Sequence, residues 1–243
     1  MNRPLVLFAG AALCSVVLTS CPKSVKTITR LQHMEEGVKN PTSIEELQDA
    51  IRKYQERVVD IQTATTQTGV WYKMLGTRYL DQKMYGKALE CFRQAVEIYP
   101  DNQNLYYYIG VCAGFMAHTD LDYNGTGKKT FGGNSNYLKL SEDAYLRAVA
   151  IEPRYVRALY GLGVLYVHEL DEPEKAIPHL EKLLTIDTKN INAMIVLAHA
   201  YHLSADYDNA VKLYDKIAAT SKVEETRQNA LDQKRQALEE SYR

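Results

Sequence analysis

The pattern of hydrophobic and polar positions changes twice along the chain. Residues 5–18 form one apolar run without a charge. Between Ile44 and Ile61, apolar residues recur every three or four positions on one stripe, which predicts an amphipathic helix. From about residue 69 to residue 220 the same helical period returns in consecutive segments whose apolar sides mix aromatic and small residues. This pattern predicts an all-α chain that follows an apolar leader.

The leader has the features of a secretion signal. The apolar run follows Arg3 and is too short to span a bilayer comfortably. It ends in Leu18-Thr19-Ser20-Cys21, which resembles the lipobox of bacterial lipoproteins. The resemblance implies that residues 1–20 are a cleaved signal peptide and that Cys21 carries a lipid. The chain would then be anchored to a membrane of the bacterial cell envelope, facing the periplasm; an ordinary signal peptide that contains Cys21 is the alternative.

Composition narrows the possible functions. The chain is 46% hydrophobic and 24% charged, as globular proteins are, and its formal net charge is −1. A near-neutral chain lacks the basic surface that nucleic-acid binding requires, so no nucleic-acid partner is expected. Cys91 and Cys112 remain after the predicted cleavage, beside Cys21. Export would permit a disulfide between them, and two small core residues are the alternative.

The segment that begins at Gly69 has the spacings of a known helical repeat. It resembles the tetratricopeptide repeat, W-x2-L-G-x2-Y followed by A-x3-F and P, with a tyrosine in place of the tryptophan. Gly76 is small enough to let two antiparallel helices approach, and Phe92 fills the space around that contact. The matching residues are Tyr72, Leu75, Gly76, Tyr79, Ala88, Phe92, Ala95 and Pro100.

Three further copies follow, near Gln103, Val156 and Ile191, so that four repeats cover residues 69–220. The second copy carries an insertion at about residues 117–137. The resemblance implies a solenoid of antiparallel helix pairs in which each repeat buries its apolar faces against its neighbours. Flanking segments complete the expected organisation: a tether at 21–42, an N-terminal capping helix at 43–68 that opens with the capping box of Ser43 and Glu46, and a C-terminal capping helix at 221–243.

In this family the first helices of successive repeats line a concave groove. Here its centre would be aromatic and apolar, which is typical of a surface that binds a ligand or partner. Only Lys73 and Arg157 could clamp a peptide carboxylate, and they lie in repeats that are not adjacent, so that mode is not favoured. Alternatively, flanking helices or a partner subunit would cover these aromatic residues. The expected groove residues are Lys73, Thr77, Leu80, Asp81, Asn104, Tyr107, Val111, Gly114, Phe115, Arg157, Tyr160, Val164, His168, Asn192, Ile195, His199 and His202.

The insertion contains fragments of two ligand-binding motifs. Residues 120–125 match the D-x-D-x-N-G half of a calcium loop, but Phe131 stands where the closing glutamate belongs, so a plain turn-rich loop is the preferred interpretation. Residues 125–130 resemble a phosphate loop, which we reject because Asp122 replaces the required first glycine. The insertion would emerge beside the groove, where it would gate the groove, touch a partner or have no role.

The chain offers little for catalysis. His168, His199 and His202 could meet as metal ligands, although histidines that form hydrogen bonds in the groove are the preferred interpretation. Established catalytic motifs are absent from the sequence, so we expect a non-enzymatic protein with no cofactor and no metal. Two functions remain: a scaffold that binds an envelope protein or peptide in the groove, or an accessory ligand-binding component of a periplasmic TRAP-type solute-uptake system, in contact with its substrate-binding protein.

Overall fold

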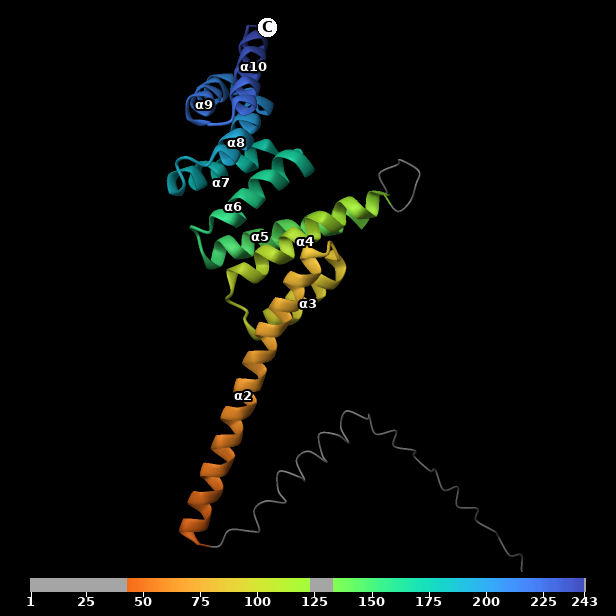
Figure 1. The fold of residues 1–243 in the computed structure, drawn as a ribbon, viewed down its shortest axis with the longest axis vertical. Helices are drawn as coiled ribbons and strands as arrows, with labels where there is room; N and C mark the ends of the chain where they lie inside the picture. Colours follow the sequence, from red (N-terminus) through yellow and green to blue (C-terminus); the bar gives the residue numbers. More distant parts are fainter. Residues whose placement is uncertain (1–42, 123–132, 243) are drawn as a thin grey trace, which may run out of the picture. The chain divides into compact units, whose positions relative to one another are not determined.

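The computed structural model describes residues 43–122 and 133–242. Within these ranges all regular structure is helical, which confirms the predicted all-α class. The predicted signal peptide, Cys21, the tether and most of the two loop motifs lie outside the described residues. The helices are α2 (Ile44–Asp81), α3 (Tyr85–Ile98), α4 (Gln103–Asp122), α5 (Gly133–Ile151), α6 (Val156–Val164), the π-helical turn η1 (Leu165–Glu169), α7 (Pro173–Ile186), α8 (Ile191–Leu203), α9 (Tyr207–Thr220) and α10 (Glu224–Ser241) (Figure 1).

Helix α2 begins at the expected capping box. The Ser43 amide donates to Glu46 Oε2 at 3.2 Å, and the Glu46 amide donates to Ser43 Oγ at 3.1 Å. The helix then runs unbroken past residue 68, where the sequence had suggested a boundary between a capping helix and the first repeat. The chain divides into two compact units inside this helix, at Ile61 and Gln62. In the first unit the apolar stripe of α2 is largely exposed.

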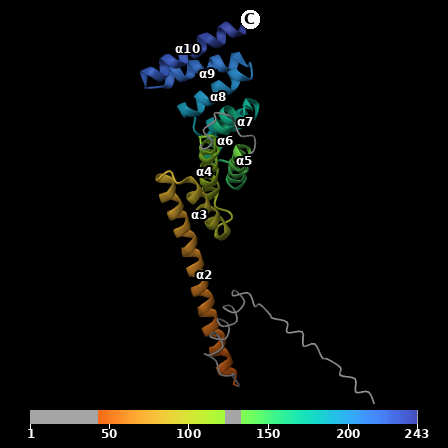
Figure 2. The ribbon, with the colours of Figure 1, turned by 90° about the vertical axis from the view of Figure 1, so that its right-hand side faces the viewer.

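The second unit is a stack of helices in which each element packs on the next. Contacts run in order from α3 to α10, and Figure 1 and Figure 2 show these helices following one another along the stack. Contacts also join α4 to α6 and α6 to α8, so the first helices of successive pairs lie on one side. This is the arrangement expected of a repeat solenoid, in which a hairpin is stabilised by its neighbours.

Small residues on the first helices accept large residues from the second helices. A Cβ atom built on Gly76 would lie 2.8 Å from the Phe92 ring, and one built on Gly110 would lie 2.5 Å from the Tyr145 ring. Because real Cβ atoms do not approach so closely, only glycine fits at either position without rearrangement. The predicted contact between Gly76 and Phe92 is therefore confirmed.

Three turns that join the helices within a pair share one geometry. Each contains one non-glycine residue in the left-handed region, and the amide that follows donates to the carbonyl of a tyrosine in the preceding helical segment. The left-handed residues are Lys83, Asp171 and Ala205, with φ of 59°, 54° and 57°, and the hydrogen bonds join Met84 to Tyr79 (2.8 Å), Glu172 to Tyr166 (2.9 Å) and Asp206 to Tyr201 (2.9 Å).

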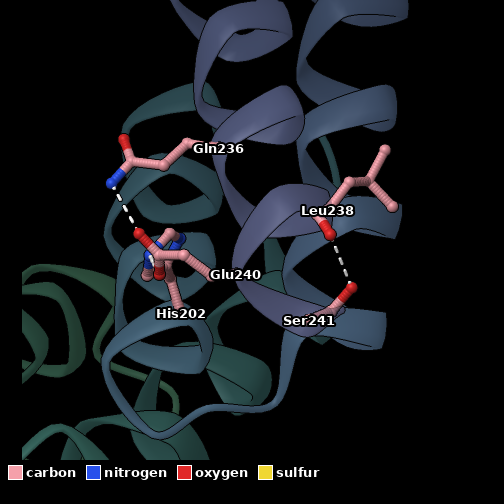
Figure 3. A network of polar contacts seen from close by, with 5 residues as sticks. All are labelled: His202, Gln236, Leu238, Glu240 and Ser241. Atoms are coloured by element: carbon pink, nitrogen blue, oxygen red, sulfur yellow. Dashed lines mark hydrogen bonds and ion pairs between the residues drawn. The ribbon is translucent and has the colours of Figure 1, made fainter. Parts of the chain in front are cut away.

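The last helix, α10, packs on α9 and also touches α8. Its small residues Ala230 and Ala237 are buried, and Lys234 Nζ lies 2.7 Å from Asp215 Oδ1 on α9. Glu240 Oε2 lies 2.9 Å from His202 Nε2 on α8, a contact that Figure 3 shows close by. Because the buried side chains of α10 are small, this helix can lie close to α9. It closes this end of the stack.

The two cysteines in the described ranges, Cys91 and Cys112, are buried and free, so the structure favours core residues over a disulfide. Burial raises the pKa of the Cys112 thiol to about 12. Among residues 43–122 and 133–242, no helix is long and apolar enough to cross a membrane.

Candidate functional site

A pocket of about 310 Å³ opens in the second unit, between α4, α5, α6 and the π-helical turn η1. Most of its wall is apolar, and its volume lies at the lower end of the range for ligand sites. Its lining consists of Tyr107, Val111, Gly114, Phe115 and His118 from α4, Ser141 and Tyr145 from α5, Arg157, Tyr160, Gly161 and Val164 from α6, and Leu165 and Glu169 from η1.

Tyr145 is held between two glycines on neighbouring helices. A Cβ atom on Gly110 of α4 or on Gly161 of α6 would lie 2.5 Å or 2.8 Å from its ring. Beside it, Ser141 Oγ donates to the Gly110 carbonyl at 2.8 Å, which satisfies a buried hydroxyl. Burial raises the pKa of the Tyr145 phenol. This part of the pocket is therefore rigid and uncharged.

Tyr107 lies at the centre of an aromatic group. Its ring centroid is 6.0 Å from that of Tyr145 and 5.9 Å from that of Tyr155, which meets it edge to face. The Arg157 guanidinium carbon lies 6.0 Å from the same ring, within reach of a cation–π contact. Burial raises the pKa of Tyr107, and the positive charge of Arg157 opposes part of that rise. The group thus combines aromatic surface with one positive charge.

Polar groups are few among the other lining residues. His118 Nε2 lies 3.0 Å from Glu169 Oε1, and this pair is partly exposed. The Phe115 ring stacks on Tyr85 with a centroid distance of 4.5 Å, yet Phe115 remains exposed. Arg157, which lines the pocket, forms no ion pair with any of the residues that the structure describes.

The structure brings together the central part of the expected groove. Seven of its residues line the pocket: Tyr107, Val111, Gly114, Phe115, Arg157, Tyr160 and Val164. Asn104 lies outside the lining, where its side-chain oxygen accepts a 2.8 Å hydrogen bond from the Tyr155 hydroxyl. The other expected residues that lie outside the lining are Lys73, Thr77, Leu80 and Asp81 on α2, His168 on η1, and Asn192, Ile195, His199 and His202 on α8.

The π-helical turn explains why Glu169 lines the pocket and His168 does not. The expected groove counted α-helical steps, from Val164 to His168. The Leu170 amide instead donates to the Leu165 carbonyl at 3.1 Å, a five-residue step that widens the turn by one residue. Five positions after Val164 is Glu169. The expected position is therefore displaced by one residue, because the local helical period differs from 3.6.

The three histidines expected in the groove have different surroundings. The His168 and His199 rings lie 5.5 Å apart, and burial, followed by the charges of His168 and His202, lowers the pKa of His199. His202 lies under α10 with Glu240 rather than on an open surface. Within residues 43–122 and 133–242, no three histidine, cysteine or acidic side chains converge as a metal site would require.

Some lining residues were missed for identifiable reasons. His118 continues the three-residue step from Phe115, but the expected lining stopped one position too early. Ser141 and Tyr145 come from a second helix, whereas the family pattern places the groove on first helices. The sequence feature that could have indicated Tyr145 is the pair of glycines, Gly110 and Gly161, that leave room for its ring. The residues missed in all were His118, Ser141, Tyr145, Gly161, Leu165 and Glu169.

Comparison with known families identifies the repeats. Residues 70–102 and residues 167–233 each match a tetratricopeptide-repeat model, so the chain carries tetratricopeptide repeats. The segment between them contains the second repeat and its insertion, where the chain departs most from the repeat pattern.

Similar proteins extend this result to most of the chain. A TPR repeat-containing protein of Borreliella burgdorferi is 24% identical over 200 residues, which cover 82% of this chain and 84% of that protein. The crystal structure of MamA aligns with a TM-score of 0.52 at 24% identity and covers 74% of this chain and 95% of that one. TTC0263, a thermophilic TPR protein of Thermus thermophilus, aligns with a TM-score of 0.52 at 16% identity, over 89% and 96% of the two chains. The fold is thus a tetratricopeptide-repeat solenoid.

Proposed function

We propose that this chain is a lipid-anchored scaffold of the bacterial cell envelope that binds a partner protein through the pocket between α4 and α6. The observation that carries the proposal is the aromatic, apolar wall built by Tyr107, Val111, Tyr160 and Val164 on the first helices of adjacent repeats. Concave apolar surfaces of this kind are typical binding sites. The repeats supply a rigid frame, so partner binding needs little ordering of the site.

The lining indicates what kind of segment would fit. An aromatic or branched apolar side chain of the partner would pack among the tyrosines, and its size is limited by the volume of about 310 Å³. Arg157, which has no ion-pair partner among the described residues, would favour a neighbouring carboxylate on the partner. A short peptide with an apolar residue beside an acidic one therefore matches the site best.

The anchoring part of the proposal rests on the Leu18–Cys21 motif. Lipid on Cys21 would hold the chain at a membrane, and residues 21–42 could extend on the order of 60 Å from it. Metabolic labelling with palmitate, followed by membrane fractionation, tests this step. We expect a labelled, membrane-bound chain and an unlabelled, unanchored Cys21→Ser variant; a wild-type chain without label would contradict the anchor while leaving the pocket untouched.

A second candidate function is an accessory ligand-binding role in periplasmic solute uptake. The apolar pocket would also hold a small amphipathic carboxylate, with its acid group beside Arg157. The two candidates differ in what occupies the pocket. A small molecule that remains bound after purification, identified by native mass spectrometry, would favour uptake, whereas a protein cross-linked through the pocket favours the scaffold.

Site-specific cross-linking tests the pocket directly. A photoreactive phenylalanine analogue at Phe115, which is exposed in the lining, should capture a partner in the native envelope. Tyr160→Ala should reduce this capture by at least about tenfold, since it removes a large apolar contact from the centre of the site. Tyr242→Ala is the matched control, because Tyr242 is 87% exposed outside the pocket, and it should have no effect. Equal capture by both variants would overturn the proposed site.

A further inference from the structure

The first half of α2 carries an apolar stripe with an unusually regular spacing. Its apolar residues are separated alternately by three and four positions: Ile44, Leu47, Ile51, Tyr54, Val58 and Ile61. Five of them are strongly exposed, with Ile44 at 75%, Leu47 at 46%, Ile51 at 55%, Val58 at 52% and Ile61 at 46% of full accessibility. A row of exposed aliphatic side chains over nearly three heptads is a costly surface for a water-facing helix.

This spacing is that of a coiled-coil seam. Two apolar positions in seven give a period of 3.5, narrower than the broad stripe of a helix that packs in a globular core. The first position of each heptad, a, holds a β-branched residue, Ile44, Ile51 or Val58. The first of the intervening d positions holds Leu47. Tyr54 and Ile61 hold the other two d positions, so the combination that favours two parallel strands, a β-branched residue at a with leucine at d, is present at Leu47.

The polar positions of the helix agree with this pairing. Asp49, opposite the seam, pairs with Lys53 at 2.8 Å and also with Arg52, so the outer face is solvated and charged. In a parallel pair the positions that flank the seam would bring Ala50 close to Gln55 of the other copy. The next flanking contact would join Arg57 and Gln62, so no like charges meet.

We propose that residues 44–61 pair with the same residues of a second copy of this chain, in parallel and in register, as a short two-stranded coiled coil. The inference goes beyond the proposed partner binding and does not depend on it, since the seam and the pocket lie in different units of the chain. Pairing would bury the exposed Ile44, Leu47, Ile51 and Val58 against their equivalents. It would also give each assembly two pockets, which strengthens binding to a multivalent partner.

The oligomeric state of the full chain tests the pairing. Cys14→Ser and Cys21→Ser keep the chain unlipidated, and sedimentation equilibrium measures its mass over a range of concentrations. We expect a dimer. Ile51→Gln should raise the dimer dissociation constant by at least about tenfold, because each dimer loses two buried isoleucines. Gln has at least the helix propensity of Ile, so circular dichroism should show that the variant remains folded.

Glu56→Gln is the matched control, since Glu56 lies on the outer face of the heptad pattern, and it should leave the dissociation constant unchanged. A monomer at all concentrations, or equal effects of the two glutamine substitutions, would overturn the pairing.

Disulfide trapping tests the orientation. In the same serine background, Leu47→Cys should cross-link two copies under mild oxidation, because equivalent d positions meet in a parallel pair, whereas Glu56→Cys should not. The native Cys91 and Cys112 are buried, so the chain without an added cysteine gives the background level of cross-linking. Cross-linking of Leu47→Cys only to a Val58→Cys chain would show an antiparallel pair and overturn the proposed arrangement.

Discussion

Helix α10 and the first half of α2 were both expected to cap the solenoid, and they differ in how their apolar sides are used. In α10, Ala230 and Ala237 are buried, and Leu231 and Leu238, at 43% and 37% exposure, are the other apolar residues of a mainly polar helix. In α2, the larger Ile44, Ile51 and Val58 are exposed. A narrow alanine side lets α10 lie close to its neighbours, and two leucines remain exposed on it. The larger aliphatic residues of α2 leave more apolar surface exposed, and this is the surface that the proposed second copy would cover.

The largest effect on stability should come from placing a charge in the buried contact between α10 and α9. Ala237 is 0% exposed, so Ala237→Asp would bury a carboxylate and cost about 2–4 kcal/mol of unfolding free energy, or release the helix locally. Urea denaturation measures the stability, and amide hydrogen exchange over residues 224–241 detects local release. Leu238→Asp, at a neighbouring position that is 37% exposed, should cost less than about 1 kcal/mol. If the two variants behaved alike, α10 would not be held by its alanine side.

A second variant places an aspartate on the apolar stripe of α2, where we expect it to affect dimerisation and not the stability of the repeat stack. Ile51→Asp should leave the unfolding of the repeat stack unchanged, because Ile51 is exposed in the chain, yet it should abolish the proposed dimer. Urea denaturation and sedimentation equilibrium measure the two properties separately. A loss of stack stability in this variant would show that the stripe supports the repeats instead of a second copy.

Sequence reasoning was most successful where a pattern depends on contacts within one helix pair. The spacing of Gly76 and Phe92 marked their contact, because a large residue needs a small one opposite. Counting three and four residues along α4 and α6 also placed Tyr107, Val111 and Tyr160 on one face. These inferences needed only the α-helical period and the order of the repeats.

It was less successful where the local geometry or a distant segment decides the outcome. The five-residue step from Leu165 to Leu170 turns Glu169 into the pocket, and no simple propensity marks that step. His202 was expected in the groove because its position in the repeat is a groove position. Glu240 covers it from thirty-eight residues away, and the repeat pattern carries no information about that contact.

A weaker effect of acid is expected at the end of the stack that α10 closes. Burial, with the charges of His168 and His202, lowers the pKa of His199 in the folded chain below its usual 6.5. As the pH falls through 6.5, the unfolded chain therefore binds more protons than the folded one, and stability is lost. Hydrogen exchange at about pH 7.5 and about pH 5.5, on either side of the usual histidine pKa, should show increased opening of α8, which His199→Gln reduces.

Residues 44–61 contain no histidine, so their exchange should not respond to the protonation of imidazoles. An equal response in the two regions, or an unchanged response in His199→Gln, would show that His199 is not the group responsible.

The smallest effect concerns the turn that leads into α9, the helix on which α10 packs. Ala205 has φ of 57°, a conformation that costs an L-residue about 1 kcal/mol and that glycine adopts freely. Because glycine also loses more chain entropy on folding, Ala205→Gly should stabilise the stack by only about 0.5 kcal/mol, measured by urea denaturation. Ala205→Val should destabilise it, since a β-branched side chain tolerates the left-handed region poorly. Neither variant should alter dimerisation, because the turn supports the covered end alone; a change in the dimer dissociation constant would show that the two regions are coupled.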